Sequence, residues 1–338
     1  MDKLPIEILK KISNRKIVSL IVIPLLVAFL VNLYLIFYFE RFSPNPFYFI
    51  VNKKLSILKK IDKKVDWLVV GDSSGNQGVN PAIIKDSIGG SSYNLCTFAD
   101  MGLMDGCWML DYLIKSDLAP KNVIMVQVYD SWNRNVYPAL FGQYPFSWIY
   151  RKAVEPELFI PEQYRKDVFY SHFLPIIHQA DRIPDRIKTL RSFKQKLAYI
   201  DDNGYNPYTF GVNEYEINAD FKYHLKYTTD REPYISPHNL IAIKYLQEIS
   251  ENTDINIYLA NSPLHDELFA DSTFNKFYTK LNEIISSHFN ESGRVHYINN
   301  PPILFNKSLL QSSDHLTDEG AEIFTRHLLK EISKAKLE

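Results

Sequence analysis

The most constraining feature of this 338-residue chain is an uncharged apolar stretch from Ile17 to Phe39. It reads IVSLIVIPLLVAFLVNLYLIFYF and contains a single proline. About 20 apolar residues suffice for a helix to cross a hydrocarbon core of about 30 Å. The stretch therefore predicts a transmembrane helix at residues 17–39. The alternatives are a cleaved signal peptide, which has a shorter apolar core, and a buried soluble helix, which is rarely apolar all round.

Basic residues lie on both sides of the apolar stretch. Those before it are Lys3, Lys10, Lys11, Arg15 and Lys16. By the positive-inside rule they favour a single-pass membrane protein with a cytoplasmic tail at 1–16 and an extracytoplasmic main domain. Those after it, in VNKKLSILKKIDKKVD, are Lys53, Lys54, Lys59, Lys60, Lys63 and Lys64. Their helical spacing predicts either a solvated helix face or a stripe that rests on anionic headgroups.

Composition bounds the class of the main domain. The chain is 46% hydrophobic and 14% aromatic, which is ample for a packed core, and its formal net charge of −1 gives no attraction for nucleic acid. It contains no zinc-spaced Cys/His set, no Walker loop and no dinucleotide fingerprint, so we expect no metal and no cofactor. Cys96 and Cys107 are expected to be buried free thiols rather than a disulfide.

From Phe47 onward the pattern alternates between short apolar runs and amphipathic helices. Strands are expected at 67–70, in SSYNLCTF, at 123–128, at 255–259 and in RVHYINNPP. Helices are expected in NPAIIKDSIG, DGCWMLDYLIKSDL, at 238–250, in FNKFYTKLNEIISSHF and after Thr317. This alternation predicts an α/β domain over 47–338, a parallel sheet with flanking helices. A less regular region at about 137–234 is expected to be a mostly helical insertion that forms a lid, a partner surface or a satellite core.

Two motifs far apart in the sequence suggest a nucleophile and its base. GDSSGNQGVNP places Ser73 directly after the first strand, and DHLTDEGAEIF places His315 just before the last helix. The carboxyl ends of parallel strands form sites at one edge of a sheet. A serine hydroxyl becomes a nucleophile when a histidine lies within hydrogen-bond reach and a third group orients that histidine. We therefore expect Ser73 and His315 to meet at this edge.

These two blocks, with YNLCTFADMG between them, resemble the SGNH/GDSL hydrolase superfamily over roughly 65–135 and 239–333. The chain looks most similar to the membrane-anchored, exported branch that serves acyl transfer in the cell envelope. The resemblance implies a three-layer, flavodoxin-like parallel sheet. It implies Ser73 as nucleophile, His315 as general base, and the N–H groups of Ser73 and Gly102 as oxyanion donors.

The chain departs from the family pattern at two places. The family places its orienting Asp three residues before the His, where this chain has Ser312, while Asp314 is adjacent to His315. A neighbouring side chain normally points elsewhere, so a Ser–His dyad supported by a carbonyl or by Ser312 is the alternative to a triad through Asp314. The family's Gly-x-Asn-Asp turn is replaced by VQVYDSWN, in which Asp130 and Asn133 are positional candidates for substrate or oxyanion contacts.

Two further polar residues need an interpretation. His265, in NSPLHDE, follows a strand, where it either contacts substrate or is an ordinary loop histidine. Asp72, beside the nucleophile, is more typical of a turn or a helix cap than of an acid catalyst. No role is assigned to the remaining histidines, which are His172, His178, His224, His238, His288, His296 and His327.

The functional expectation follows from the resemblance. It implies transfer or removal of a small acyl group, such as acetyl, on an envelope polysaccharide or lipid-linked glycan. It also implies a multispanning membrane O-acyltransferase as a partner. A simple esterase or lipase is the second possibility. The alternative from another class is a catalytically silent scaffold that binds a glycan or organises an envelope biosynthetic complex.

Overall fold

The computed structural model describes residues 14–42, 46–135, 166, 169–170, 173–178, 200–207, 212, 214–289, 293–298 and 302–335. Much of the insertion expected at 137–234 lies outside these residues. Two helices of that region are described, α11 (Pro175–His178) and α13 (Glu214–Thr229). The tail at 1–13 also lies outside them.

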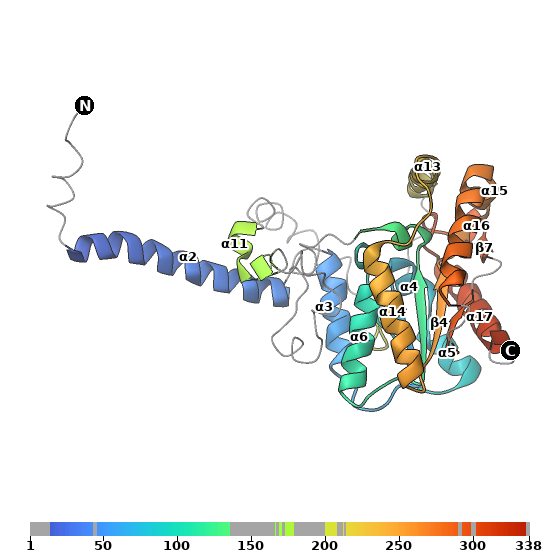
Figure 1. Cartoon of the computed structure of the whole chain (residues 1–338), viewed down its shortest axis with the longest axis horizontal. Helices are drawn as coiled ribbons and strands as arrows, with labels where there is room; N and C mark the ends of the chain where they lie inside the picture. Colours follow the sequence, from blue (N-terminus) through green and yellow to red (C-terminus); the bar gives the residue numbers. More distant parts are fainter. Residues whose placement is uncertain are drawn as a thin grey trace.

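The N-terminal apolar stretch forms one long helix, α2 (Asn14–Phe42), which projects away from the α/β domain (Figure 1). Its most apolar part, Ser19–Ile36, has a mean hydropathy of 2.6, and only 11% of these residues are buried. The helix is therefore long and apolar enough to cross a membrane, as predicted for 17–39. Its orientation stays a prediction.

The main domain is built on a five-stranded parallel sheet with the strand order β2-β1-β3-β4-β6. The strands are β1 (Trp67–Gly71), β2 (Ser92–Asn94), β3 (Asn122–Gln127), β4 (Asn256–Asn261) and β6 (Val295–Tyr297). A separate small sheet pairs β5 (Leu264–His265) with β7 (Leu304–Phe305). In the main sheet the chain starts at β1 and adds β2 on one side, then returns to place β3 on the other side of β1 and continues outward to β4 and β6. This is the doubly wound order, and its switch point lies between β1 and β3.

Helices cover both faces of the main sheet, because the central strands β1 and β3 are buried along their whole length on both sides. Leu68 and Val70 of β1 belong to the core that α3 (Pro46–Leu58), α6 (Met104–Lys115), α14 (Pro237–Asn252) and α16 (Ser272–Ser287) complete. Trp67 and Val69 face the opposite core, completed by α5 (Pro81–Ile88) and α17 (Asp318–Ala335). Figure 1 shows α3, α6 and α14 on one side and α5 and α17 on the other. The α/β prediction is confirmed.

The lysine-rich segment after α2 differs from its prediction at one residue. Lys54 of α3 is completely buried, and its ammonium group donates hydrogen bonds to the backbone carbonyl oxygens of Asn94, at 2.9 Å, and Gly204. The prediction of a solvated or headgroup-bound lysine face is therefore wrong here. Val51, Leu55 and Leu58 pack in the core and bury this side of α3. Lys54 lies on the same side, and it can be buried because backbone carbonyl groups accept hydrogen bonds from its ammonium group.

The two cysteines, Cys96 and Cys107, are both buried and free, as predicted.

Candidate active site

The chain turns sharply where β1 delivers the first motif. Gly71 has φ +134°, and Asp72 then caps α4 (Ser73–Gly78) by accepting a hydrogen bond from the Ser74 N–H at 2.9 Å. The second carboxylate oxygen of Asp72 accepts from the Val128 N–H, which joins the ends of β1 and β3. The capping role predicted for Asp72 is confirmed. Burial raises the pKa of Asp72 to about 6, against the effect of these hydrogen bonds.

Ser73 is the first residue of α4 and is half-buried. An N–H group at the first position of a helix has no carbonyl partner within the helix. This N–H therefore stands beside the hydroxyl on the same residue, at the carboxyl end of a central strand. That is the placement expected for a nucleophile with one oxyanion donor.

The second motif forms a tight loop that turns the side chains of Asp314 and His315 toward each other. Leu310 pairs with Leu316 in an antiparallel bridge, and the Gln311 N–H donates to the His315 carbonyl at 2.8 Å. Within this loop Oδ1 of Asp314 lies 2.7 Å from Nδ1 of His315. The Asp314 side chain was expected to point away from its neighbour His315, and this expectation is wrong. The closure of the loop brings the two side chains together.

Ser312 completes this contact. Its hydroxyl lies 2.8 Å from Nδ1 of His315 and 3.0 Å from Oδ1 of Asp314. Burial disfavours the imidazolium form, but the Asp314 carboxylate outweighs it and raises the pKa of His315 to about 9. Ser312 and Asp314, the two side chains that the sequence offers for orienting His315, therefore both contact its Nδ1. Nε2 of His315 is left as the nitrogen that can accept a proton from a nucleophile.

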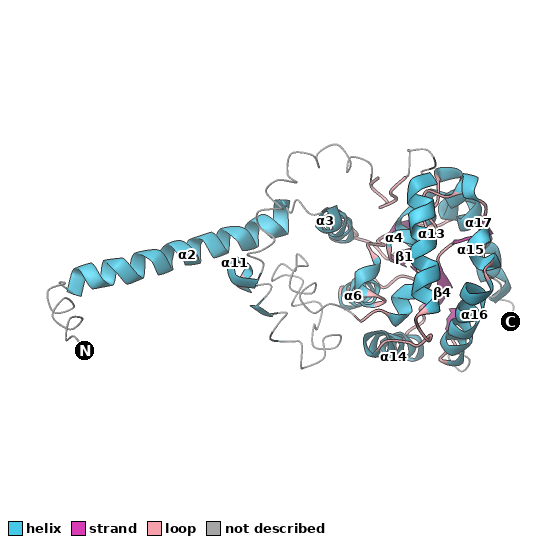
Figure 2. Cartoon of the chain, turned by 90° about the horizontal axis from the view of Figure 1, so that it is seen from above, coloured by secondary structure: helices cyan, strands magenta, loops and turns pink. Residues whose placement is uncertain are grey.

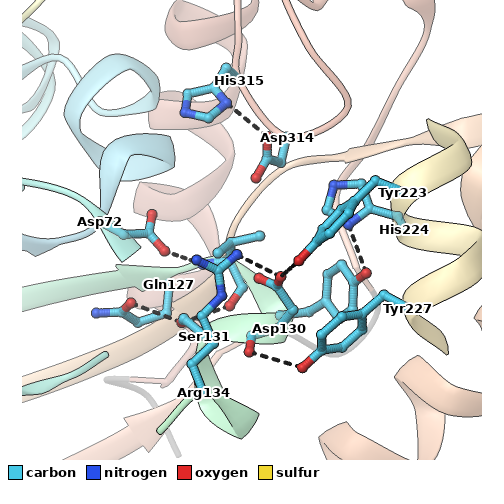
Figure 3. Close-up of polar contacts among 12 residues, drawn as sticks. Asp72, Gln127, Asp130, Ser131, Arg134, Tyr223, His224, Tyr227, Asp314 and His315 are labelled. Carbon is cyan, nitrogen blue, oxygen red and sulfur yellow. Dashed lines mark hydrogen bonds and ion pairs between the residues drawn. The ribbon is translucent and has the colours of Figure 1, made fainter. Parts of the chain in front are cut away.

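The Ser73 block and the His315 block lie at the same end of the sheet. The charge of Asp314 adds to burial in raising the pKa of Asp72, and the charge of Asp72 adds to that of Asp314 in raising the pKa of His315; Figure 3 shows the three side chains at this edge. Behind them, Gly78 of α4 lies against Phe324 of α17. Within the described part of the chain, no hydrogen bond joins the Ser73 hydroxyl to His315.

Gly102 is held in a different environment from the one that the resemblance implies. It has φ +55°, and its N–H donates to the Ala99 carbonyl at 3.1 Å, closing the short helix η1 (Ala99–Met101). Its carbonyl accepts from the side-chain amide of Gln127 at 3.1 Å. A Cβ atom at this position would lie 2.4 Å from Oδ1 of Asn239. The Gly102 N–H is therefore engaged inside the protein and is not directed at a substrate in this conformation.

The two candidates after β3 differ in how their polar atoms are satisfied. Both belong to the short helix η2 (Tyr129–Asn133). The Asp130 carboxylate is fully buried and pairs with the Arg134 guanidinium at 2.6 Å. Asn133 is 1% exposed, and neither its amide nitrogen nor its amide oxygen has a hydrogen-bond partner among the described residues. A buried amide without partners is costly, so Asn133 is the better candidate for a group that contacts a ligand.

His265 has a structural position. Its Nδ1 accepts a hydrogen bond from the Glu267 N–H at 3.1 Å at the start of α15 (Asp266–Ala270). Its ring, 2% exposed, lies edge-on to Phe221 at 6.0 Å between centroids. These contacts are those of a helix-capping loop histidine.

Helix α13 contributes side chains to this edge that were not predicted from the sequence. Nδ1 of His224 lies 2.7 Å from the Tyr129 hydroxyl. Burial opposes the lowering of the pKa of Asp314, which is due mainly to His315 with a smaller contribution from the nearby His224. Tyr223 reaches the Asp130 carboxylate at 3.5 Å, and Asp220 raises the pKa of His315. Figure 3 shows Tyr223, His224 and Tyr227 extending from this helix toward the strand ends. The i, i+3, i+4 and i+7 spacing of these residues was the available signal.

Unsatisfied buried polar atoms mark the same edge. Besides Asn133, atoms without a hydrogen-bond partner in the described ranges include Oδ1 of Asp130, Oγ of Ser262, which follows β4, and Oγ of Ser313. These groups come from segments far apart in the sequence. Buried polar atoms without partners are rare, and a bound ligand or water at this edge would account for these four residues. Within the same ranges, no cluster of three or more His, Cys, Asp or Glu side chains is arranged to hold a metal ion.

The arrangement can support acyl-group chemistry, since a hydroxyl beside a free N–H shares one sheet edge with a carboxylate-oriented histidine. Comparison of the sequence with protein-family models and with curated proteins gave no match to either.

Proposed function

We propose that this protein is a membrane-anchored SGNH-like acyltransferase or esterase that acts on O-acyl groups, such as acetyl, of a cell-envelope polysaccharide. The observation that carries the proposal is the 2.7 Å contact between Asp314 and His315 at the sheet edge where Ser73 begins α4. The doubly wound strand order, with Ser73 after β1 at the switch point, agrees with the flavodoxin-like sheet of this superfamily.

The proposed chemistry uses Ser73 and His315 in two half-reactions. Nε2 of His315 takes the proton from the Ser73 hydroxyl as Oγ attacks the acyl carbon of an ester or thioester. The Ser73 N–H stabilises the oxyanion, and the leaving group departs with the proton from His315. A sugar hydroxyl or water then attacks the acyl-enzyme through the same base. Asp314 holds the proton on Nδ1, which keeps Nε2 available throughout.

Membrane attachment of the domain supports the proposal that its substrate lies at the membrane. A helix anchor raises the effective concentration of the domain near lipid-linked glycans or near a membrane-bound acyl donor. In this proposal α2 spans the membrane with residues 1–16 in the cytoplasm and the α/β domain outside. A multispanning O-acyltransferase is the partner that would deliver acyl groups to such a domain.

A catalytically silent scaffold is the second candidate, and two observations favour it. The Ser73 hydroxyl makes no hydrogen bond with His315 among the described residues, and the Gly102 N–H is occupied by Ala99. Such a protein would bind a glycan through the polar strand ends without turning it over.

Release and transfer of acetate distinguish these candidates. The full chain, reconstituted in lipid nanodiscs, is incubated with an O-acetylated polysaccharide, and free acetate is measured with and without an unacetylated acceptor glycan. The enzyme proposal expects turnover that disappears in Ser73→Ala and persists in Ser287→Ala, whose serine is exposed on α16. Binding of the polysaccharide by wild type and Ser73→Ala alike, without acetate release or transfer, would favour the scaffold.

A further inference from the structure

One polar side chain interrupts the most apolar part of α2. Asn32 lies within Ser19–Ile36, yet it is only 6% exposed, whereas neighbouring large apolar side chains such as Leu30 and Val31 are 53% and 42% exposed. A polar group at membrane depth is unfavourable unless it finds a hydrogen-bond partner in protein. Asn32 is therefore shielded by another part of the chain.

The segment that buries Asn32 comes more than a hundred positions later in the sequence. The Asn32 side chain donates from Nδ2 to the Phe173 carbonyl at 2.6 Å and accepts, through Oδ1, from the Ile176 N–H at 3.2 Å. Pro175 is the first residue of α11, so Ile176 carries one of the N–H groups that the helix leaves without an internal partner. Asn32 thus caps α11 from the apolar helix. Figures 1 and 2 both show α11 alongside the part of α2 nearest the α/β domain.

The capped segment is apolar on its outer side. Ile177 is 67% exposed, Phe169 is 53% exposed and Tyr170 is 41% exposed. The Phe169 and Phe173 rings are 4.6 Å apart, so the aromatic residues form one cluster. Contiguous exposed apolar surface that continues the surface of a membrane-crossing helix fits lipid acyl chains.

Depth along α2 decides where this surface lies. Asn32 is seven residues before Phe39, the last residue of the uncharged apolar stretch. At about 1.5 Å per residue this places Asn32 about 10 Å inside that end of the stretch. Backbone at such a depth needs its polar groups satisfied by protein, and Asn32 provides partners for the Phe173 carbonyl and the Ile176 N–H, on either side of Leu174 and Pro175.

We propose that residues 169–170 and 173–178 form a second membrane-embedded element, which Asn32 holds in the lipid leaflet on the α/β side of the membrane. We name it the leaflet element. The leaflet element comes between η2 and α13 in the sequence, so the α/β domain is tethered to the bilayer at two points instead of one. The inference rests on α2 crossing a membrane, which is part of the proposed function, but it does not depend on the chemistry at Ser73.

Depth-dependent fluorescence quenching tests the element in the full chain in phosphatidylcholine nanodiscs. Ile177→Cys, Leu26→Cys in α2 and Tyr215→Cys in α13 are each labelled with an environment-sensitive fluorophore. Their native side chains are 67%, 54% and 82% exposed, so all three sites accept a label. The native thiols are buried, and the parent protein treated identically gives the background. Aqueous iodide and acyl-chain spin labels serve as the two quenchers.

We expect the 177 probe to resemble the 26 probe, with several-fold weaker iodide quenching and stronger acyl-chain quenching than the 215 probe. Iodide quenching at 177 equal to that at 215, with 26 protected, would overturn the leaflet element while leaving α2 in the membrane. An aqueous probe at 26 would overturn the crossing of α2 and the inference with it.

A second variant tests the tether. Asn32→Leu keeps α2 apolar but removes both hydrogen bonds to the leaflet element. We expect the 177 probe to lose several-fold of its acyl-chain quenching in this background, while the 26 probe is unchanged. Unchanged quenching at both positions would overturn the role of Asn32.

Discussion

Oδ1 of Asp314 lies 2.7 Å from Nδ1 of His315, although the two residues are adjacent in sequence. The carboxylate therefore comes one residue before the histidine, whereas the family pattern that the sequence resembles has it three residues before. Ser312, at that earlier position, contacts the same nitrogen at 2.8 Å. The orienting role is thus divided between a charged and a neutral partner, and substitution separates their contributions.

Asp314→Asn is expected to lower kcat/KM for p-nitrophenyl acetate by about 10²- to 10⁴-fold, because general base catalysis depends on the orientation and charge of His315. Ser312→Ala is expected to have a much smaller effect, since it removes only a neutral hydrogen bond. Steady-state kinetics of both variants check this order. A larger loss in Ser312→Ala would assign the orienting role to Ser312.

The activity of the wild type is expected to rise with pH toward the alkaline range. Asp314 overcomes the effect of burial and raises the pKa of His315 to about 9, so the neutral base is a minor form at pH 7. The logarithm of kcat/KM should increase with pH until about 9. In Asp314→Asn this rising part of the pH–rate profile should move to lower pH, because the charge that raises the pKa of His315 is removed. A pH–rate profile with a limb near the ordinary histidine value of about 6.5 would contradict the assignment.

The same pair makes a pH-dependent contribution to stability. His315 has a higher pKa in the folded state than in the unfolded state, so its contribution is full below about 6.5 and is lost as pH rises through about 9. Urea unfolding of wild type and His315→Gln measures it, and the stability difference between them should shrink across this window. A difference that is constant from pH 6 to 10 would contradict the ion pair.

Lys54→Met is expected to destabilise the protein by about 1–3 kcal/mol, because the carbonyl groups of Asn94 and Gly204 lose a buried donor. Lys60→Met, on the exposed end of the same segment, is the control and should be neutral.

Burial lowers the pKa of Lys54 to about 7 from 10.5, so between these pH values the unfolded chain binds one proton more than the folded chain. The stability of wild type relative to Lys54→Met should therefore rise between these pH values. Equal stability of the two variants would contradict this account.

Gly102→Ala is expected to cost about 1–3 kcal/mol, because φ is +55° and the new Cβ would meet Oδ1 of Asn239 at 2.4 Å. Gly293→Ala is the matched control, since nothing lies within 4 Å of its Cβ position. Thermal or denaturant unfolding of the two variants measures the difference. Equal stabilities would show that the loop between η1 and α6 relaxes around the new side chain.

The central strands were predictable because buried parallel strands are short runs of large apolar residues. β1, β3 and β4 lie within about two residues of their predicted bounds. Capping was predictable for a local reason. Asp72 accepts from an N–H two residues later, and the Thr317 hydroxyl accepts from the Gly320 N–H at 3.2 Å. Such contacts depend on sequence neighbours alone.

The remaining features depend on contacts between distant residues. Lys54 is buried because Gly204, 150 positions away, offers its carbonyl oxygen. Asp314 turns toward His315 because Leu310 and Leu316 pair across the loop. His224 reaches Tyr129, 95 positions away, only once α13 lies over the strand ends. The helical spacing of the α13 residues is visible in the sequence, but the residues that they contact are not, so sequence reasoning predicted the positions of Ser73 and His315 but not their surroundings.

Fluorophosphonate labelling of the full chain, read out by intact mass and peptide mapping, tests the central claim most directly. The account predicts a single adduct on Ser73 that is absent from Ser73→Ala and greatly slowed in His315→Ala and Asp314→Asn. Folding of each variant is checked by circular dichroism. A folded wild-type protein that forms no adduct, or forms one on another serine, would contradict an activated nucleophile at Ser73.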